Sequence, residues 1–224
     1  MKKDDFKLND TDYTALEIGD RGYILNKGAS LYKEETFKEA TEYYRLAATL
    51  GDPQACSNLG YCYLYGRGIE VNVSLAIAYF KIAARARCID AIYKLGDIYG
   101  SNKWVKEDKE LSTYYYTQAM RVLTKDQNSL YFSDKVRRYP SLCFALAREE
   151  LPKGYLMTNL DEAYELLRTA KIGYKIELLN GSNMYEEKYK EVCNYLKDDM
   201  FDEIEKRFRA KYRVDESDEF IGED

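Results

Sequence analysis

The stretch ACSNLGYCYLYGRGIEVNVSLAIAYFKIAA, Ala55–Ala84, decides the fold of this chain. It reads as two helices joined by a loop that contains Gly66 and Gly68. Its small and aromatic residues recur 36 positions later, where Ala55, Leu59, Gly60, Tyr63, Phe80 and Ala83 correspond to Ala91, Leu95, Gly96, Tyr99, Tyr116 and Ala119. A period of this length is typical of stacked helical hairpins. A single hairpin cannot bury its apolar face alone, so we expect neighbouring hairpins to stack.

The alternation of small and large side chains gives this repeat a physical basis. Gly60 and Ala76 are small enough for two antiparallel helices to approach closely. Leu59, Tyr63 and Phe80 are large enough to fill the space toward the next hairpin. The sequence therefore predicts a close contact between the paired helices and an apolar layer between successive pairs.

The segment that begins at Leu59 resembles the Sel-like repeat, a branch of the tetratricopeptide superfamily with a longer loop between its helices. The resemblance rests on Leu-Gly, a Tyr three residues on, a Gly-x-Gly-hydrophobic loop, and then Ala, an aromatic residue and Ala-Ala. The family usually has Asp before the second helix, where this chain has Asn72, which is also a good helix N-cap. Weaker copies extend the resemblance over roughly residues 19–173. It implies a curved helical solenoid that serves as a protein-interaction scaffold.

We therefore predict an all-α protein, a right-handed α-solenoid of about four stacked antiparallel helix pairs with a C-terminal capping helix. The solenoid is expected over residues 12–181, with repeats at about residues 19–52, 53–88, 89–123 and 140–173. A flexible N-terminus is expected at residues 1–11, and one or two capping helices at residues 182–213. The last segment, residues 214–224, is acidic and poor in core residues, so we expect it to be disordered.

The composition argues against several classes of partner. The 224 residues carry a net charge of −5 and the pI is near 5.2, so we expect neither a nucleic-acid partner nor an anionic membrane surface. The N-terminal sequence MKKDDFKLNDTDY lacks the apolar run of a signal peptide. We therefore expect a cytoplasmic protein that acts away from the membrane.

Catalysis is not expected from this sequence. The chain has no His, which removes His-dependent acid–base chemistry, and its 5 Cys form no CxxC pair, so reduced and mostly buried thiols are expected. The carboxylate pairs Glu149-Glu150 and Asp198-Asp199 are adjacent in sequence and would point in different directions on a helix. We therefore expect no enzyme activity, no cofactor and no metal site.

The candidate partner-binding residues follow from the family resemblance, since the first helix of each pair lines the concave face of such an array. Together with an aromatic residue in a loop, the positions are Gln54, Ser57, Tyr61, Leu64, Tyr65, Tyr93, Asp97, Trp104, Phe144 and Arg148. A Tyr-lined surface favours an extended or helical peptide. Two alternatives stay open: Tyr61 and Tyr93 could pack between adjacent first helices, and Trp104 could be a lid on its hairpin or an exposed anchor.

The leading hypothesis is a scaffold or adaptor that binds a protein or peptide ligand. The alternative is a structural protein that forms homo-oligomers through residues 182–213, which carry more apolar residues than one capping face needs. The oligomeric state, monomer or weak homodimer, is therefore left open by the sequence.

Overall fold

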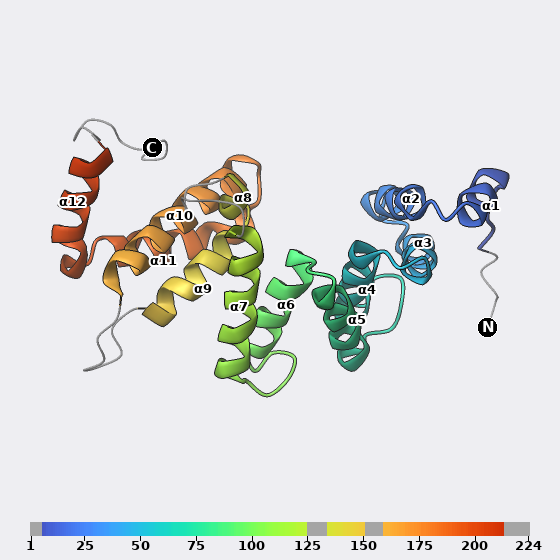
Figure 1. Ribbon diagram of the computed structural model, residues 1–224, viewed down its shortest axis with the longest axis horizontal. Coiled ribbons are helices and arrows are strands. Elements are labelled where there is room, and N and C mark those ends of the chain that lie inside the picture. The colour runs from blue at the N-terminus through green and yellow to red at the C-terminus, as the bar shows by residue number, and fades with distance from the viewer. Residues whose placement is uncertain (1–5, 125–133, 151–158, 213–224) are drawn as a thin grey trace. The chain divides into compact units, whose positions relative to one another are not determined.

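The structure is a computed structural model that describes residues 6–124, 134–150 and 159–212 (Figure 1). The predicted all-α fold is confirmed, with helices packed in consecutive antiparallel pairs. The chain divides into two compact units, residues 1–115 and residues 116–224, which are treated separately below. The tail predicted at residues 214–224 lies outside the described residues. Among the described helices, none is long and apolar enough to cross a membrane.

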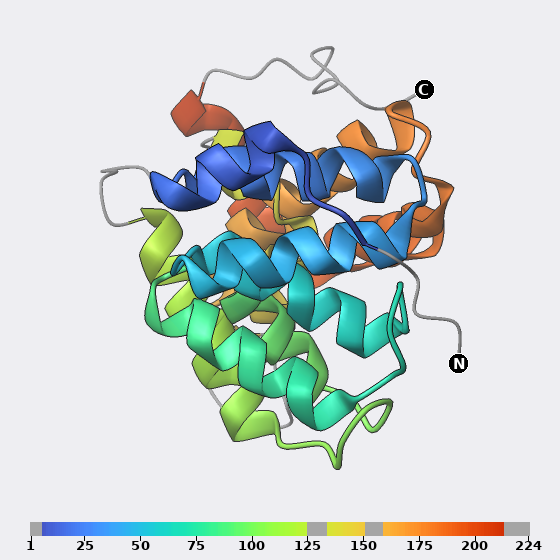
Figure 2. The ribbon, with the colours of Figure 1, turned by 90° about the vertical axis from the view of Figure 1, so that its right-hand side faces the viewer.

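The N-terminal unit is a stack of helix pairs. Its helices are α1 (Asp10–Glu17), α2 (Arg21–Lys33), α3 (Phe37–Thr49), α4 (Pro53–Tyr65), α5 (Val73–Arg85) and α6 (Ile89–Tyr99). Helix α7 (Lys109–Thr124) crosses the boundary between the two units. Helices α2 and α3 form one pair and α4 and α5 the next, while α3 packs on α4 and α5 on α6. Figure 2 faces this unit and shows the helices following one another in chain order.

Close contacts between paired helices depend on glycine. A Cβ atom at Gly60 of α4 would lie 2.7 Å from the ring of Phe80 in α5, and one at Gly28 of α2 would lie 2.9 Å from the ring of Tyr44 in α3. Leu59 and Phe80 are fully buried. The predicted role of Gly60 is therefore confirmed, because any larger residue would push the two helices apart.

The turns between pairs share one construction. Gly19 and Gly51 adopt left-handed backbone angles, and the following residues, Asp20 and Asp52, accept hydrogen bonds from backbone N–H groups that open α2 and α4. Before α6 the corresponding residues are Arg87, with a φ of 63°, and Cys88, whose side chain makes no cap hydrogen bond. This turn therefore keeps the geometry of the other two without their favoured residues.

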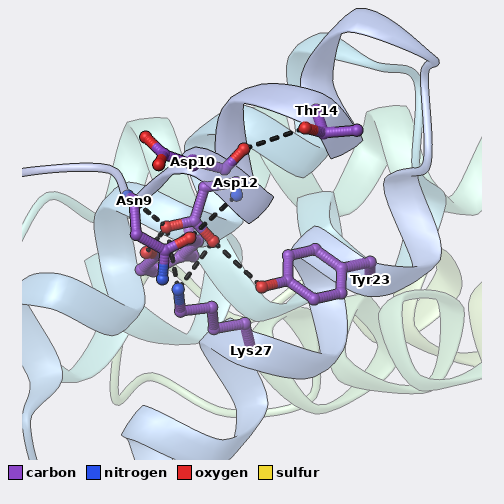
Figure 3. A network of polar contacts seen from close by, with 7 residues as sticks. Asn9, Asp10, Asp12, Thr14, Tyr23 and Lys27 are labelled. Atoms are coloured by element: carbon purple, nitrogen blue, oxygen red, sulfur yellow. Dashed lines mark hydrogen bonds and ion pairs between the residues drawn. The ribbon is translucent and has the colours of Figure 1, made fainter.

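The N-terminal segment is tied down by a buried carboxylate (Figure 3). Asp12 is fully buried, and Lys27 Nζ lies 2.6 and 2.8 Å from its two oxygens. The hydroxyl groups of Tyr43 and Tyr23 donate to the same carboxylate over 2.8 and 3.2 Å, and Asn9 N donates over 2.9 Å. This network joins α1, α2 and α3.

The ordered part of the chain begins earlier than the sequence predicts. The ring of Phe6 packs edge-on against Tyr43 with 5.2 Å between centroids, and Asn9 caps α1 in a capping box with Asp12. The expected flexible segment, residues 1–11, therefore does not include Phe6–Thr11.

The C-terminal unit contains α8 (Asp134–Arg137), α9 (Pro140–Glu150), α10 (Leu160–Leu179), η1 (Asn183–Tyr185), α11 (Glu186–Leu196), η2 (Asp199–Phe201) and α12 (Asp202–Tyr212). Helices α9 and α10 pack as a hairpin, in the segment where a fourth pair was predicted, and α11 packs on α10. The chain breaks between α11 and α12, so residues 182–213 hold two α-helices rather than one.

Helix α12 packs against α10 through aromatic rings. The rings of Phe201 and Phe208 lie 5.5 and 5.8 Å from the ring of Tyr164, between centroids. Arg207 adds an exposed ion pair with Asp161 at 2.9 Å. Val192 of α11 is also fully buried. The apolar residues of this segment thus serve packing within the unit.

Candidate functional site

Two tyrosines of α4 form the centre of the candidate site. The ring of Tyr61 packs edge-on against Phe80, with 5.1 Å between centroids, and stacks on the ring of Tyr65 at 6.3 Å. Tyr61 is half-buried, whereas Tyr65 remains 43% exposed. Tyr61 therefore anchors the site to the core, and Tyr65 presents its ring to the surroundings.

Trp104 completes this aromatic group from the loop between α6 and α7. Its ring meets that of Tyr65 edge-on, with 5.6 Å between centroids, and it is half-buried. Lys103 Nζ lies 4.9 Å from the Trp104 ring. Trp104 thus folds back onto the preceding helix pair and keeps part of its surface accessible, which combines features of the predicted lid and the predicted anchor.

The preceding inter-helix loop reaches back in the same way. The Arg67 guanidinium lies 5.3 Å from the Tyr32 ring and 5.5 Å from the Phe37 ring, measured to the ring centroids. The Thr41 hydroxyl contacts the Arg67 carbonyl oxygen at 3.1 Å. A Cβ atom at Gly68 would lie 2.1 Å from the Phe37 carbonyl oxygen, so only glycine fits there. Each loop therefore carries a cation against aromatic rings of the pair before it.

Helix α6 supplies the polar part of the site. Lys94 Nζ lies 5.6 Å from the Tyr61 ring centroid, 5.4 Å from that of Tyr93 and 2.6 Å from Asp97 Oδ2. The sequence analysis missed Lys94, although its place beside Tyr93 and three residues before Asp97 could have indicated it. This lysine links the aromatic and acidic members of the site.

A second link joins α4 to α6. Gln54 Nε2 donates to Asp90 Oδ2 over 3.3 Å, and Gln54 Oε1 accepts from Cys88 Sγ over 3.4 Å. Burial raises the pKa of the Tyr61 hydroxyl far above its ordinary value, and the nearby carboxylates of Asp90 and Asp97 raise it further. Tyr61 therefore stays neutral across the physiological range and keeps its hydroxyl proton for hydrogen bonding.

Four predicted residues do not join this group. Ser57 and Leu64 are fully buried in α4, and no hydrogen-bond partner is found for Ser57 Oγ among the described residues. Phe144 is buried in the C-terminal unit, with its ring centroid 5.9 Å from that of Tyr195. Arg148 is exposed in that same unit. The placement of Ser57, Leu64 and Phe144 corrects the expectation that their side chains face a partner, because repeat register predicts the orientation of a helix only approximately.

The structure thus brings together six of the predicted residues, which we call the aromatic surface: Gln54, Tyr61, Tyr65, Tyr93, Asp97 and Trp104. All six belong to the N-terminal unit. Rings and amphipathic polar groups dominate it, which suits contacts with a polypeptide.

The thiols of this chain are poor nucleophiles. All five cysteines are free, and burial raises the pKa of Cys56, Cys62 and Cys88 and raises that of Cys143 to about 12. No cluster of His, Cys, Asp and Glu able to hold a metal ion is found among the described residues.

Comparison with known proteins bears on the N-terminal part of the chain. A family model described as the Sel1 repeat matches residues 17–52, 53–88 and 89–120. An uncharacterized protein of Neisseria meningitidis serogroup B is 30% identical over 102 residues, covering 46% of this chain and 22% of the relative. A Helicobacter pylori protein named "Putative beta-lactamase HcpC" is 38% identical over 50 residues, covering 22% of this chain and 17% of the relative. The chain spans less than a quarter of these relatives.

Two solved structures share the fold. One is a Sel1 repeat protein from Oxalobacter formigenes, with a TM-score of 0.54, 20% identity, and coverage of 70% of this chain and 58% of that one. The other is a protective antigen of uropathogenic Escherichia coli strains described as displaying an SLR fold, with a TM-score of 0.55, 21% identity, and coverage of 72% and 33% respectively.

Proposed function

This chain is a Sel1 repeat protein of the tetratricopeptide-like superfamily, with its matched repeats in residues 17–120, and we propose that it is a non-catalytic scaffold. In this proposal the aromatic surface holds a peptide or a protein segment. Helical repeat arrays of this kind commonly serve as protein-interaction modules, and stacked repeats offer extended binding surfaces. Which residues bind, and what they bind, is our inference.

One observation carries the proposal. The accessible rings of Tyr65 and Trp104 meet at a point where two successive helix pairs contribute side chains, with Tyr61 anchoring them to the core. Tyrosine and tryptophan are the residues most often found at binding hot spots, since they offer a large apolar area with a polar group attached. Gln54 and Asp97 supply polar groups at the same surface.

The charge pattern narrows the kind of ligand. Asp97 is paired with Lys94, and Asp90 accepts from Gln54, so no cluster of unpaired cations faces this surface in the part of the chain that the structure describes. A groove that grips a terminal carboxylate would need such a cluster. An internal peptide segment, held by ring contacts and backbone hydrogen bonds, is therefore the better fit.

A peptide library displayed on phage, panned against the immobilised full chain, would test this proposal. An enriched peptide is expected to bind wild type and to lose about tenfold or more in affinity with a Tyr65→Ala/Tyr93→Ala double variant. Tyr114→Ala is the matched control, because Tyr114 is equally exposed, at 55%, but lies outside the aromatic surface. Peptides that bind all three proteins with equal affinity would place the site elsewhere.

We propose that the chain has no hydrolase activity, although one relative carries a beta-lactamase name. A serine nucleophile needs an accessible hydroxyl beside a base, whereas Ser57, in the repeat core, is fully buried and the chain has no His. Incubation with a chromogenic β-lactam is expected to give no hydrolysis above the buffer rate. Turnover that disappears in a Ser57→Ala variant would contradict this part of the proposal.

The remaining expectations stay proposals as well. The five free thiols suit a reducing compartment, so we propose a cytoplasmic location, which fractionation of cells producing the protein would check. The net charge of −5 argues against nucleic acid as ligand. Oligomerisation through residues 182–213 loses its original support, since Val192, Phe201, Ile204 and Phe208 are buried within the C-terminal unit.

A further inference from the structure

Helix α5 exposes apolar side chains along one face. Leu75 is 41% exposed, Ile82 is 50% exposed, and Ala78 between them is also exposed. Positions three and four residues apart lie on one side of a helix, so these three residues form a continuous line that we call the α5 stripe. Val71, just before the helix, is 58% exposed. The stripe is separate from the aromatic surface, which uses α4, α6 and the loop after α6.

The same face is polar in the preceding pair. In α3 the residues 36 positions before Leu75 and Ala78 are Glu39 and Glu42, as expected for a helix face in water. Nothing in the repeat itself therefore requires apolar residues there. A large side chain exposed at Leu75 and another at Ile82, one turn on either side of a small residue, instead resemble one half of a helix–helix contact.

The charges at the ends of α5 select the partner. Exposed Glu70 lies just before the helix, whereas exposed Arg85 and Arg87 lie at its other end. Two copies of this face placed antiparallel would bring the acidic end of each against the basic end of the other. A face of this kind is complementary to itself, which is what a two-fold symmetric dimer requires.

The sequence positions fit a two-fold axis at the centre of the helix. Leu75 and Ile82 are equally far from the midpoint between Ala78 and Tyr79, and so are Glu70 and Arg87. Around an axis through this midpoint, Leu75 of one copy would face Ile82 of the other. Ala78 would lie at the crossing point, where a small side chain lets two helices approach.

From the exposure, the spacing and the charge pattern we propose that the α5 stripe is the contact surface of a symmetric homodimer of this chain. The contact is limited to one helix of 13 residues, about 20 Å long. Such a small interface gives a weak dimer, with a Kd of about 10–100 µM. The dimer leaves the aromatic surface of each copy out of the contact, so two ligands could be held by one assembly.

The mass of the full chain, measured by sedimentation at concentrations from about 5 to 500 µM, tests the proposal. Wild type is expected to shift from monomer to dimer over this range. Leu75→Arg and Ile82→Glu are each expected to raise the Kd by about tenfold or more while leaving the circular dichroism spectrum and the melting midpoint unchanged. A chain that stays monomeric up to the highest concentration overturns the proposal.

Leu179→Glu is the matched control, because Leu179 is more exposed than either stripe residue, at 71%, but belongs to α10 of the C-terminal unit. It is expected to leave dimerisation unchanged. A dimer that is lost with Leu179→Glu and kept with Ile82→Glu would also overturn the proposal and place the contact in the C-terminal unit.

A charge exchange gives the sharpest test. Glu70→Lys and Arg87→Glu are each expected to weaken the dimer, because each places like charges together at both ends of the contact. The double variant Glu70→Lys/Arg87→Glu restores opposite charges and is expected to recover dimerisation. An equal mixture of the two single variants is expected to dimerise better than either alone, since every contact in the mixed dimer pairs opposite charges. A mixture no better than its components would exclude this antiparallel arrangement.

Discussion

Asp12 shows how much a single buried carboxylate can contribute at the residue scale. Burial alone would raise its pKa, but hydrogen bonds from Lys27, Asn9 and Tyr43 outweigh that effect and hold the pKa below the ordinary value. The pKa of Lys27 is raised in return, since its hydrogen bond to Asp12 outweighs its own partial burial. The pair is therefore fully ionised at neutral pH.

Asp12→Asn is expected to destabilise the N-terminal unit by about 2–3 kcal/mol, because it leaves Lys27 without its counter-ion in a largely buried place. The estimate is at or below the low end for buried pairs, since the Lys27 side chain is still 27% exposed. Urea unfolding followed by tryptophan fluorescence would measure the loss. The double variant Asp12→Asn/Lys27→Met is expected to regain part of it, and a double variant as unstable as the sum of both single variants would show that the two residues do not interact.

The pH dependence of this contribution follows from the two shifts. A carboxyl group whose pKa is lowered by folding stabilises the folded state above its unfolded pKa of about 3.9, and loses that contribution as the pH falls through the folded value. A lysine whose pKa is raised stabilises the folded state below its unfolded pKa of about 10.4 and loses the contribution at higher pH. The stability difference between wild type and Asp12→Asn is thus expected to be constant from about pH 5 to pH 9 and to shrink below about pH 4. A difference that persists unchanged at pH 2 would contradict this explanation.

Glu35 offers a gain in stability. Its φ is 60°, in the left-handed region that costs a residue with a Cβ about 1 kcal/mol relative to glycine, and its side chain is exposed. Glu35→Gly is therefore expected to raise the free energy of unfolding by roughly 0.5–1 kcal/mol. Gly51→Ala is the reverse control, since Gly51 has a φ of 80° and is expected to lose a similar amount. Thermal melts of both variants would check the pair of signs.

At the scale of elements, the loop of each repeat acts as a brace on the helix pair before it. Gly68→Ala is expected to cost more than about 2 kcal/mol, because its Cβ would overlap the backbone of α3 and that backbone cannot move without disturbing a helix. Gly19→Ala separates this clash from backbone strain: its φ of 71° is similar, but no atom lies within 4 Å of the added Cβ. Equal losses in the two variants, measured by urea unfolding, would show that the loop does not bear on α3.

The elements themselves were largely predictable, because glycine and aromatic residues at a fixed period mark where helices must come close. Gly60 is the clearest case, since its role requires only a contact within one pair. The partners of Asp12 could not be predicted, because Tyr43 lies 31 positions away and no local pattern marks such a contact. Leu64 and Phe144 show a different limit: repeat register indicates which helix lines a face but does not fix the rotation of that helix closely enough to tell a surface side chain from a core one.

At the scale of the whole molecule, a repeat array is stabilised by contacts between neighbours, so its two compact units need not unfold together. The chain has a single tryptophan, Trp104, in the N-terminal unit, and its fluorescence therefore reports on that unit alone. Circular dichroism reports on the helices of both units. The two signals together can separate the stability of one unit from that of the other.

Gly173→Ala provides the perturbation for the C-terminal unit. Its Cβ would lie 2.4 Å from the Arg137 carbonyl oxygen and 2.9 Å from Pro140 Cβ, so α10 would be forced away from its neighbours. The variant is expected to move part of the circular dichroism transition to lower urea while shifting the fluorescence transition by no more than about 0.3 kcal/mol. Gly60→Ala, in the N-terminal unit, is expected to lower the fluorescence transition instead. If each variant moved both signals together, the two units would be one cooperative structure, and every stability change predicted above would then apply to the chain as a whole.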